Sequence, residues 1–257
     1  MLNSKNVKRK TIVRLAVLSD IHGNAEALRA VLEELDRQKV DQTVCLGDVV
    51  GYGPAPAECI RLVRERDLPC VMGNHDEYVT EVGAEDTWNI RDAAKESVLW
   101  TQRVLDPDDM AWLARLPMML TVGPCQFTHA SMLYWPRWRY VLNAEKAAPS
   151  FLFQGASVAF NGHTHLPILA AHRSGSEPRL TRLKSGRVQA GKSKFLVGVG
   201  SVGQPRDRDP RCSFVIYDTE TNELQHLRVT YDIEATQRAV REAGLPDSLA
   251  TRLAEGR

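Results

Sequence analysis

The chain has 257 residues, a formal charge of +1 and 25% charged residues, the balance of an ordinary globular protein. The near-zero charge argues against bulk electrostatic binding to nucleic acid or to an acidic membrane surface. No stretch approaches the ~20 apolar residues of a membrane span. Five cysteines without a CxxC pair argue against a disulfide scaffold or a Cys-type zinc site and predict a cytoplasmic location.

The N-terminus carries the one basic cluster of the sequence. The run KNVKRK occupies residues 5–10, and we expect residues 1–10 to form a flexible, solvated leader rather than a binding arm. Arg14 interrupts the apolar stretch that follows, so the h-region of a signal peptide is missing. No linker, low-complexity tract or long repeat follows, and residues 11–257 are predicted to form a single domain.

The first 75 residues alternate between strand and helix patterns. Strands are predicted at residues 14–19, 42–46 and 69–72. A helix with apolar residues at one face covers the region around 27–35, and a second helix spans 57–66 after two prolines. This β-α-β-α-β order indicates a parallel sheet covered by helices.

The rest of the chain changes pattern twice. Residues 89–116 are predicted to be helical, with Asp106 as a cap before Pro107. Residues 126–130 and 157–162 restore strands, and short strands and hairpins follow Leu180. Residues 233–255 are predicted to form helices with a break at GLP, residues 244–246.

Ligand-type side chains follow the predicted strands. Asp20 and His22 follow the first strand, Asp48 the second, and Asn74 with His75 the third. His129 closes a later strand, and the segment NGHTH places His163 and His165 two residues apart after another. Since the carboxyl ends of parallel strands meet at one edge of a sheet, these groups are expected to converge there.

The chemistry of this set points to transition metals. Imidazoles, carboxylates and one amide, with no thiolate, suit Mn, Fe, Zn, Ni or Co rather than Ca. Seven ligands are too many for one ion, but with Asp48 shared they divide into two sets of four. Two ions ~3.5–4 Å apart can bridge a water, lower its pKa and clamp phosphate oxygens. We therefore expect two divalent ions, manganese first among these metals.

The motif series resembles that of a known family. The motifs DxH, GD, GNHD, H and GHTH, in this order from residue 20 to 165, resemble the five signature motifs of the calcineurin-like metallophosphoesterase superfamily. The stretch GSVGQPRDRDPR at residues 200–211 resembles a segment of its small bacterial phosphodiesterase-like branch. The resemblance implies an α/β fold, an αββα sandwich of two mixed β-sheets flanked by helices.

The resemblance also implies a role for each motif residue. His75 looks like the family's non-ligand histidine, which protonates the leaving alkoxide or steadies the transition state. The GD motif continues here as GDVVGYG rather than as the GDxxDRG of the protein serine/threonine phosphatases. This difference disfavours phosphoprotein hydrolysis and leaves open which carboxylate orients His75. The implied ligands of one metal are Asp20, His22, Asp48 and His165, and those of the other are Asp48, Asn74, His129 and His163.

Four further residues are candidates for substrate binding. Arg206 could bind a phosphate, or it could belong to a solvated turn with internal ion pairs. In the run SMLYWPRWRYV, Trp138 and Arg137 could stack a base and meet a phosphate. Alternatively, Trp138, Tyr140 and Leu142 could pack on one side of an extended segment while the arginines face water. Tyr52 carries the same two interpretations.

The predicted function is that of a dinuclear-metal-dependent phosphoesterase acting through a metal-bridging hydroxide. Its substrates are expected to be phosphodiesters or phosphoanhydrides of nucleotide type, with a diadenosine tetraphosphate hydrolase as the more specific alternative. A non-enzymatic metal-binding scaffold on the same fold is the rival from another class. The charge pattern predicts no extended nucleic-acid surface and no membrane partner, which disfavours a nuclease of structured DNA. The sequence pattern does not indicate which oligomeric state the protein adopts.

Overall fold

The computed structural model of the protein describes residues 13–133, 138–190 and 192–257. The predicted leader, residues 1–10, lies outside this range. The described strands are β1 (Arg14–Leu18), β2 (Gln42–Cys45), β3 (Met119–Val122), β4 (Cys125–Thr128), β5 (Val158–Asn161), β6 (Pro167–His172), β7 (Arg179–Arg182), β8 (Gly186–Arg187), β9 (Lys194–Val199), β10 (Cys212–Asp218) and β11 (Glu223–Val229). The described helices are α1 (Ala25–Gln38), α2 (Pro56–Glu65), α3 (Asn74–Thr80), α4 (Asp92–Val104), α5 (Pro107–Ala114), α6 (Ala144–Phe153), α7 (Ile233–Glu242) and α8 (Asp247–Glu255).

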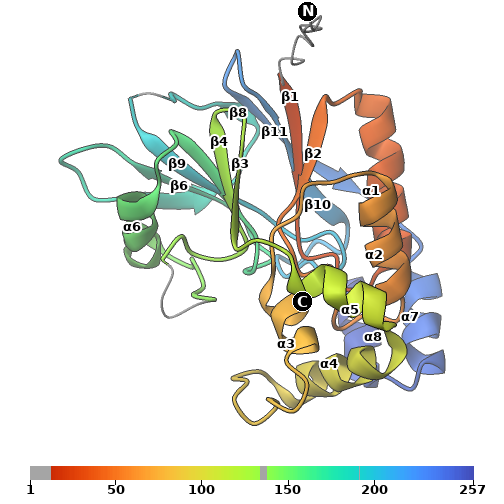
Figure 1. Ribbon diagram of the computed structural model, residues 1–257. Coiled ribbons are helices and arrows are strands. Elements are labelled where there is room, and N and C mark those ends of the chain that lie inside the picture. Colours follow the sequence, from red (N-terminus) through yellow and green to blue (C-terminus); the bar gives the residue numbers. More distant parts are fainter. Residues whose placement is uncertain (1–12, 134–137, 191) are drawn as a thin grey trace, which may run out of the picture.

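The strands form two mixed sheets (Figure 1). The first sheet has the order β2-β1-β10-β11-β8, with β1 parallel to β2 and antiparallel to β10. The second has the order β3-β4-β5-β9-β6-β7, with β4, β5 and β9 parallel to one another. The parallel pairs β1–β2 and β4–β5 are joined through the helices α1 and α6, whereas the chain between β5 and β9 contains the strands β6, β7 and β8 and, among its described residues, no helix.

Alternating side chains of β1 enter two different cores. Leu15 and Val17 pack between the sheets, against Phe127 and Phe160 of the second sheet among others. Ala16 and Leu18 point to the opposite face, where they pack under α1 and α2. A strand that is apolar on both faces must be covered on both, and the uninterrupted apolar run of β1 reflects this.

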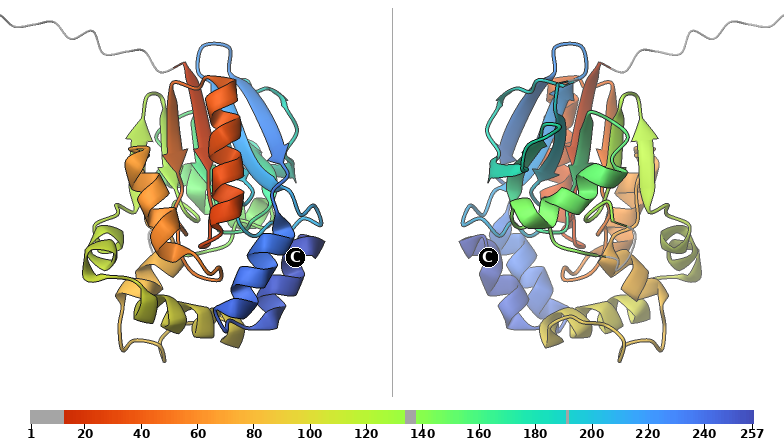
Figure 2. Two further views of the ribbon diagram at one scale, coloured as in Figure 1. Left: turned by 90° about the vertical axis from the view of Figure 1, so that its right-hand side faces the viewer. Right: turned by 90° about the vertical axis from the view of Figure 1, so that its left-hand side faces the viewer.

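The second sheet is covered on its outer face by α6. Ala147 and Phe151 of this helix pack against Ala159 of β5 and Leu196 of β9. The layers are therefore helix, sheet, sheet and helix, and the predicted αββα sandwich is confirmed. Figures 1 and 2 show α1 and α2 on one outer face and α6 on the other, with α3, α4, α5, α7 and α8 gathered at one end of the sheets.

The third predicted strand is shorter than expected. Residues 69–72 form one isolated bridge, between Cys45 and Cys70, rather than a strand. Pro69 has no N–H for a ladder, and the N–H of Met72 donates to the carbonyl of Pro117 instead, at 2.8 Å. The segment still runs parallel beside β2, so it delivers Asn74 to the same edge. None of the described helices has the length and hydropathy to cross a membrane.

Candidate metal centre

The seven side chains predicted as ligands converge on one place, where four strands end. Asp20 and Asp48 follow β1 and β2 of the first sheet, and His129 and His163 follow β4 and β5 of the second. Each is at most 5% exposed. The prediction of a single sheet edge was too simple, because the site lies where the carboxyl edges of two sheets meet. Their role as ligands stays a prediction that the following geometry supports.

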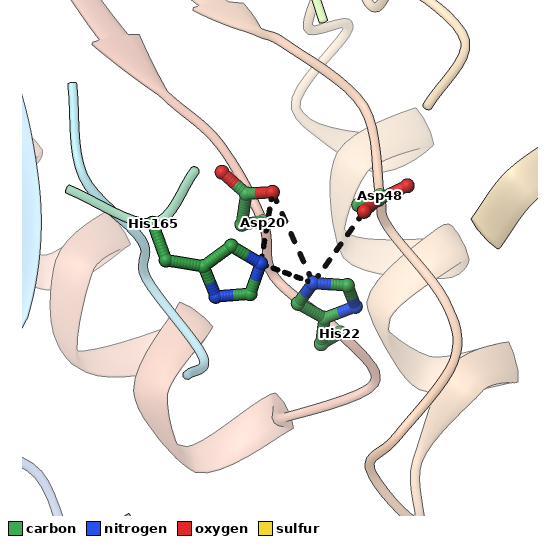
Figure 3. Close-up of side chains that lie close together, drawn as sticks. All are labelled: Asp20, His22, Asp48 and His165. Atoms are coloured by element: carbon green, nitrogen blue, oxygen red, sulfur yellow. Dashed lines mark hydrogen bonds and ion pairs between the residues drawn. The ribbon is translucent and has the colours of Figure 1, made fainter. Parts of the chain in front are cut away.

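One group consists of side chains whose potential ligand atoms all lie within 4.8 Å of one another, and these are Asp20, His22, Asp48 and His165 (Figure 3). The Nε2 atom of His22 lies 3.5 Å from Oδ2 of Asp48, and Nε2 of His165 lies 3.4 Å from Oδ1 of Asp20. The two Nε2 atoms are themselves only 3.1 Å apart.

Backbone carbonyls fix the tautomers of these two histidines. Nδ1 of His22 donates to the carbonyl of Val50 at 3.2 Å, and Nδ1 of His165 donates to that of Gln204 at 2.5 Å. A carbonyl can only accept, so the neutral rings present their Nε2 lone pairs to each other. Two facing lone pairs repel, and a cation between them removes the repulsion. This donor set therefore fits a divalent metal.

The second group shares Asp48 with the first. Nε2 of His129 lies 3.3 Å from Oδ2 of Asp48, and its Nδ1 donates to the carbonyl of Leu46 at 2.7 Å. His163 is turned the other way, because its Nε2 donates to the carbonyl of Trp138 at 2.8 Å and leaves Nδ1 for the centre. Oδ1 of Asn74 lies 3.2 Å from Nε2 of His129. The structure thus brings together both predicted sets of four, with Asp48 between them.

Burial and charge set the pKa values in this cluster. Burial holds the pKa of His22 and His165 well below its usual range and lowers that of His163 to about 3. Burial acts the same way on His129, but the neighbouring Asp48 carboxylate outweighs it and raises the pKa to about 9. The rings of His22, His163 and His165 are thus neutral, the protonation state in which an imidazole binds a metal, whereas His129 must release its proton to do so.

The backbone is strained where the ligands sit. Five of the seven have positive φ angles between 50° and 65°, namely Asp20, His22, Asp48, His163 and His165. A left-handed conformation costs a non-glycine residue roughly 1–2 kcal/mol. Such strain persists only where the surrounding structure enforces it, and it gathers at functional sites.

Gly162 allows the two sheets to approach at this point. A Cβ atom there would lie 1.9 Å from Oγ of Ser19 and 2.7 Å from Oδ2 of Asp20. The residue that follows uses this closeness, because the backbone N–H of His163 donates to the Asp20 carboxylate at 3.1 Å. The glycine of NGHTH is therefore required because a larger side chain would clash with Ser19 and Asp20.

Asp76 anchors the loop that carries Asp48. Its carboxylate accepts four backbone N–H groups, from Gly73, Asp48, Val49 and Val50, at 2.8 to 3.3 Å. The sequence left open whether Asp76 orients His75, and the described contacts of this carboxylate are to the backbone. The sequence did not predict this role, because no residue pattern marks a carboxylate that accepts hydrogen bonds from backbone N–H groups.

His75 lies beside the first group. It is 3% exposed, and its backbone N–H donates to Oδ1 of Asp48 at 2.8 Å. Its ring packs edge-on against His22, with centroids 4.9 Å apart, and is tilted by 44° against the Tyr52 ring, with centroids 4.4 Å apart. Burial lowers the pKa of His75 to about 4, so the free ring is neutral. Its Nδ1 is buried and has no hydrogen-bond partner among the described residues.

The substrate candidates lie on two sides of the centre. Tyr52 contacts His22, with ring centroids 4.6 Å apart, and its hydroxyl lies 3.4 Å from Nη2 of Arg206. The ion-paired turn that was the alternative for Arg206 forms from its neighbours instead, with Arg211 and Asp209 2.6 Å apart. Arg137 lies outside the described residues.

A cavity of about 370 Å³ opens on the side of the second group. Trp138 lines it, with its Nε1 donating to Glu77 at 2.7 Å. Tyr140 stacks on His163, with centroids 4.0 Å apart, and is 44% exposed. The aromatic residues Trp138 and Tyr140 thus line a cavity together with Arg139, and their contact with a substrate stays a prediction. The lining residues are Asn74, Tyr78, Asn89, Ile90, Trp138, Arg139, Tyr140, Leu142, Lys146 and His163.

Comparison with known proteins places this centre in context. The profile of the calcineurin-like phosphoesterase superfamily domain matches residues 13–222. An uncharacterized protein of Methanocaldococcus jannaschii is 33% identical over 251 residues, which are 95% of this chain and 98% of that protein. The crystal structure of a metallophosphoesterase from Sphaerobacter thermophilus superposes with a TM-score of 0.81 at 36% identity, covering 96% of this chain and 100% of that one.

A more distant relative has a named substrate class. A symmetrical bis(5'-nucleosyl)-tetraphosphatase of Neisseria gonorrhoeae is 32% identical over 139 residues, which are 51% of this chain and 47% of that enzyme. The chain thus spans about half the length of this relative. Taken with the fold and the arrangement of the centre, the profile match shows that the chain belongs to the calcineurin-like phosphoesterase superfamily.

Proposed function

We propose that the protein is a phosphoesterase that depends on two divalent metal ions and hydrolyses phosphodiester or phosphoanhydride bonds of nucleotide-type small molecules. The single observation that carries the proposal is the pair of ligand groups that share Asp48. One group alone would fit a structural ion, whereas two groups joined by a carboxylate fit the two-metal arrangement for attack at phosphorus.

Seven residues would hold the ions. Bound there, two divalent metals, manganese first among them, would activate a water and stabilise charge on phosphate oxygens. The chain's own contribution is to hold Asp48 ionised, since its pKa lies well below the usual range, and to hold the histidine rings in fixed tautomers. The carbonyls of Leu46, Val50 and Gln204 do the latter.

His75 is proposed to act on the leaving group. Its backbone N–H holds Asp48, and its ring lies between His22 and Tyr52 at the edge of the first group. A neutral imidazole N–H placed there can donate a hydrogen bond to the departing oxygen, where negative charge develops. Its side chain is the natural target for a variant that keeps the ligands intact.

The cavity on the second group's side supports a nucleotide-type leaving group. Its volume of about 370 Å³ falls within the range of small-molecule sites. Trp138, Tyr140 and Tyr78 offer faces for a base, and Arg139 and Lys146 offer charge for phosphates. The tetraphosphatase relative makes dinucleoside polyphosphates the first specific substrates to test. The five cysteines are free and buried, which suits the cytoplasm that we propose as its location.

The test is hydrolysis by the purified, metal-reconstituted protein. After chelation, Mn²⁺ is restored, and bis-p-nitrophenyl phosphate, p-nitrophenyl phosphate and diadenosine tetraphosphate are compared for the parent and for His75→Ala. We expect manganese-dependent turnover that falls by at least about 100-fold in the variant, with metal content unchanged. The turnover rates of diadenosine tetraphosphate and bis-p-nitrophenyl phosphate should exceed that of p-nitrophenyl phosphate.

A contrary outcome would favour the scaffold. Two bound metals per chain with no turnover of any substrate would refute the enzymatic proposal, and partner capture would then be the next measurement. Turnover of p-nitrophenyl phosphate at least equal to that of the nucleotide substrates would remove the nucleotide preference alone.

A further inference from the structure

Two arginines from distant parts of the chain meet at Tyr52. The Cζ atom of Arg206, in the loop before β10, lies 5.8 Å from the centre of the Tyr52 ring. The Cζ atom of Arg252, on α8, lies 5.9 Å from the same centre. The same ring contacts His22 and His75, so Tyr52 connects the two arginines to the metal centre.

Neither arginine has a carboxylate side chain as partner within the described residues. Nη2 of Arg206 donates to Oε1 of Gln204 at 3.0 Å and to the Tyr52 hydroxyl, while its Nε is buried and bonds to no described group. Nε of Arg252 donates to the main-chain oxygen of Arg257 at 2.5 Å. Burial and, after it, the charge of Arg206 lower the pKa of Arg252.

Two other arginines in this part of the chain, by contrast, are paired with carboxylate side chains. Arg211 pairs with Asp209, and Arg228 pairs with Asp207. A cation–π contact with Tyr52 stabilises each guanidinium by about 0.5–1 kcal/mol at an exposed site, but it leaves the repulsion between them. A bound anion would reduce that repulsion and accept hydrogen bonds from guanidinium donors that have no partner among the described residues.

The position of the pair is tied to the centre. Gln204, which accepts from Arg206 through its side chain, also accepts from candidate ligand His165 through its carbonyl. Arg252 comes from the helix pair α7–α8, which follows the family match that ends at residue 222. Figures 1 and 2 show these two helices at the end of the sheets where the ligand loops lie.

We propose that Arg206 and Arg252 form an anion site for a second phosphate group of the substrate, adjacent to the phosphate that is hydrolysed. The substrate class is then a phosphoanhydride with at least two linked phosphates, rather than a simple diester. This inference rests on the proposed function and narrows it. The sequence placed Arg206 among the candidates, whereas Arg252 lay within a predicted helix with no motif to mark it.

Binding of tripolyphosphate to the full-length chain after metal removal tests the site without turnover. Calorimetry would compare the parent with Arg206→Gln, Arg252→Gln and Arg238→Gln. Arg238 is the matched control, since it lies on α7, is 61% exposed and undergoes the same change of charge. We expect the dissociation constant to rise about 10-fold in the first two variants, as for one lost charge-assisted hydrogen bond, and to stay unchanged in the control. Equal affinity in Arg252→Gln and the parent would overturn the site.

Kinetics of the metal-loaded enzyme separates this inference from the proposed function. Arg252→Gln should lower kcat/KM for diadenosine tetraphosphate about 10-fold and leave that for bis-p-nitrophenyl phosphate unchanged. Arg252→Lys keeps the charge but loses the planar guanidinium, so its kcat/KM for diadenosine tetraphosphate should lie between that of the parent and that of Arg252→Gln. Equal losses on both substrates would refute a second phosphate site. If the parent hydrolyses neither substrate, the proposed function fails, and the tripolyphosphate titration still decides the arginine site.

Discussion

The two ligand groups share Asp48 but differ in their surroundings. The first, with His22 and His165, is at most 2% exposed and lies behind Tyr52. The second includes His163 and Asn74, which both line the cavity of about 370 Å³. The same ligand chemistry is therefore placed once in the interior and once at an opening. This difference predicts a firmly held ion at the first group and an exchangeable one at the second.

Removal of the shared carboxylate of Asp48 should weaken metal binding at both groups and so abolish the difference between them. In Asp48→Asn both groups lose a negative charge that lies 3.3 to 3.5 Å from two of their imidazoles. We expect the metal content to fall from two ions per chain to below one and the activity to fall by more than about 100-fold. This loss is larger than the roughly 10- to 100-fold loss that follows when a residue that only orients a metal ligand is replaced. Mass spectrometry of the metals and the hydrolysis assay measure both. Two retained ions would contradict the assignment of Asp48 to both groups.

Asp76 tests whether the loop under Asp48 must be held in place. Asp76→Asn keeps the volume but loses charge and acceptor capacity towards four backbone N–H groups. We expect unfolding to become easier by about 1–3 kcal/mol and metal affinity to fall roughly 10- to 100-fold. Denaturant unfolding and metal titration measure these changes. Asp109→Asn, at a partly buried carboxylate paired with Arg64, is the control and should leave metal affinity unchanged.

The rate of metal release should distinguish the two ligand groups directly. With excess chelator we expect two phases, a fast one from the group at the cavity and a slow one from the interior group. His163→Ala should remove the fast phase and His165→Ala the slow one, as followed by a metal indicator. Loss of both ions should also lower Tm, because an ion at 1,000 times its Kd stabilises the fold by about 4 kcal/mol. A single phase in the parent would show that the two sites exchange together.

His226, outside the centre, provides the smallest expected effect. Burial lowers its pKa to about 4, and its Nε2 lies 2.9 Å from Oγ of Ser213. The unfolded chain takes up the proton near pH 6.5 and the folded chain only near pH 4, so stability is lost as pH falls through this window. In His226→Gln, unfolding of the metal-free protein should depend less on pH between 6.5 and 4. An unchanged pH dependence would show that the ring titrates normally.

The sequence predicted the elements whose pattern is periodic or capped. The strands β1, β2, β4 and β5 and the helix α1 follow apolar periodicities, and Asp106 caps α5 by accepting from the N–H of Asp109. Helix α6 was missed because Pro149 lies inside it. Helix α3 was missed because its seven residues begin at Asn74, within a ligand motif, and have no apolar repeat.

The site could be predicted as a set of residues but not as an arrangement. Strand-end motifs carried all seven candidate ligands, whereas their division between two sheets depends on pairings of high sequence separation. The contacts that orient the rings were not predictable either. The carbonyls of Leu46, Val50 and Gln204 act through the main chain, so their residue types are uninformative. Arg252 had no signal, because Tyr52 and Arg206, with which it would form the anion site, are more than 40 residues away in the chain.

The direction of the strands also determines where the protein can be altered without harm. Since β1, β2, β4 and β5 all end at the metal centre, the turns that lead away from it lie at the far end of both sheets. These include the connection between β3 and β4, that between β6 and β7, and that between β10 and β11. A Cβ atom at Gly123 or Gly175, in the first two, would meet no other atom within 4 Å. These turns are thus natural insertion points for affinity tags, fluorescent labels or whole domains, on a face remote from the chemistry.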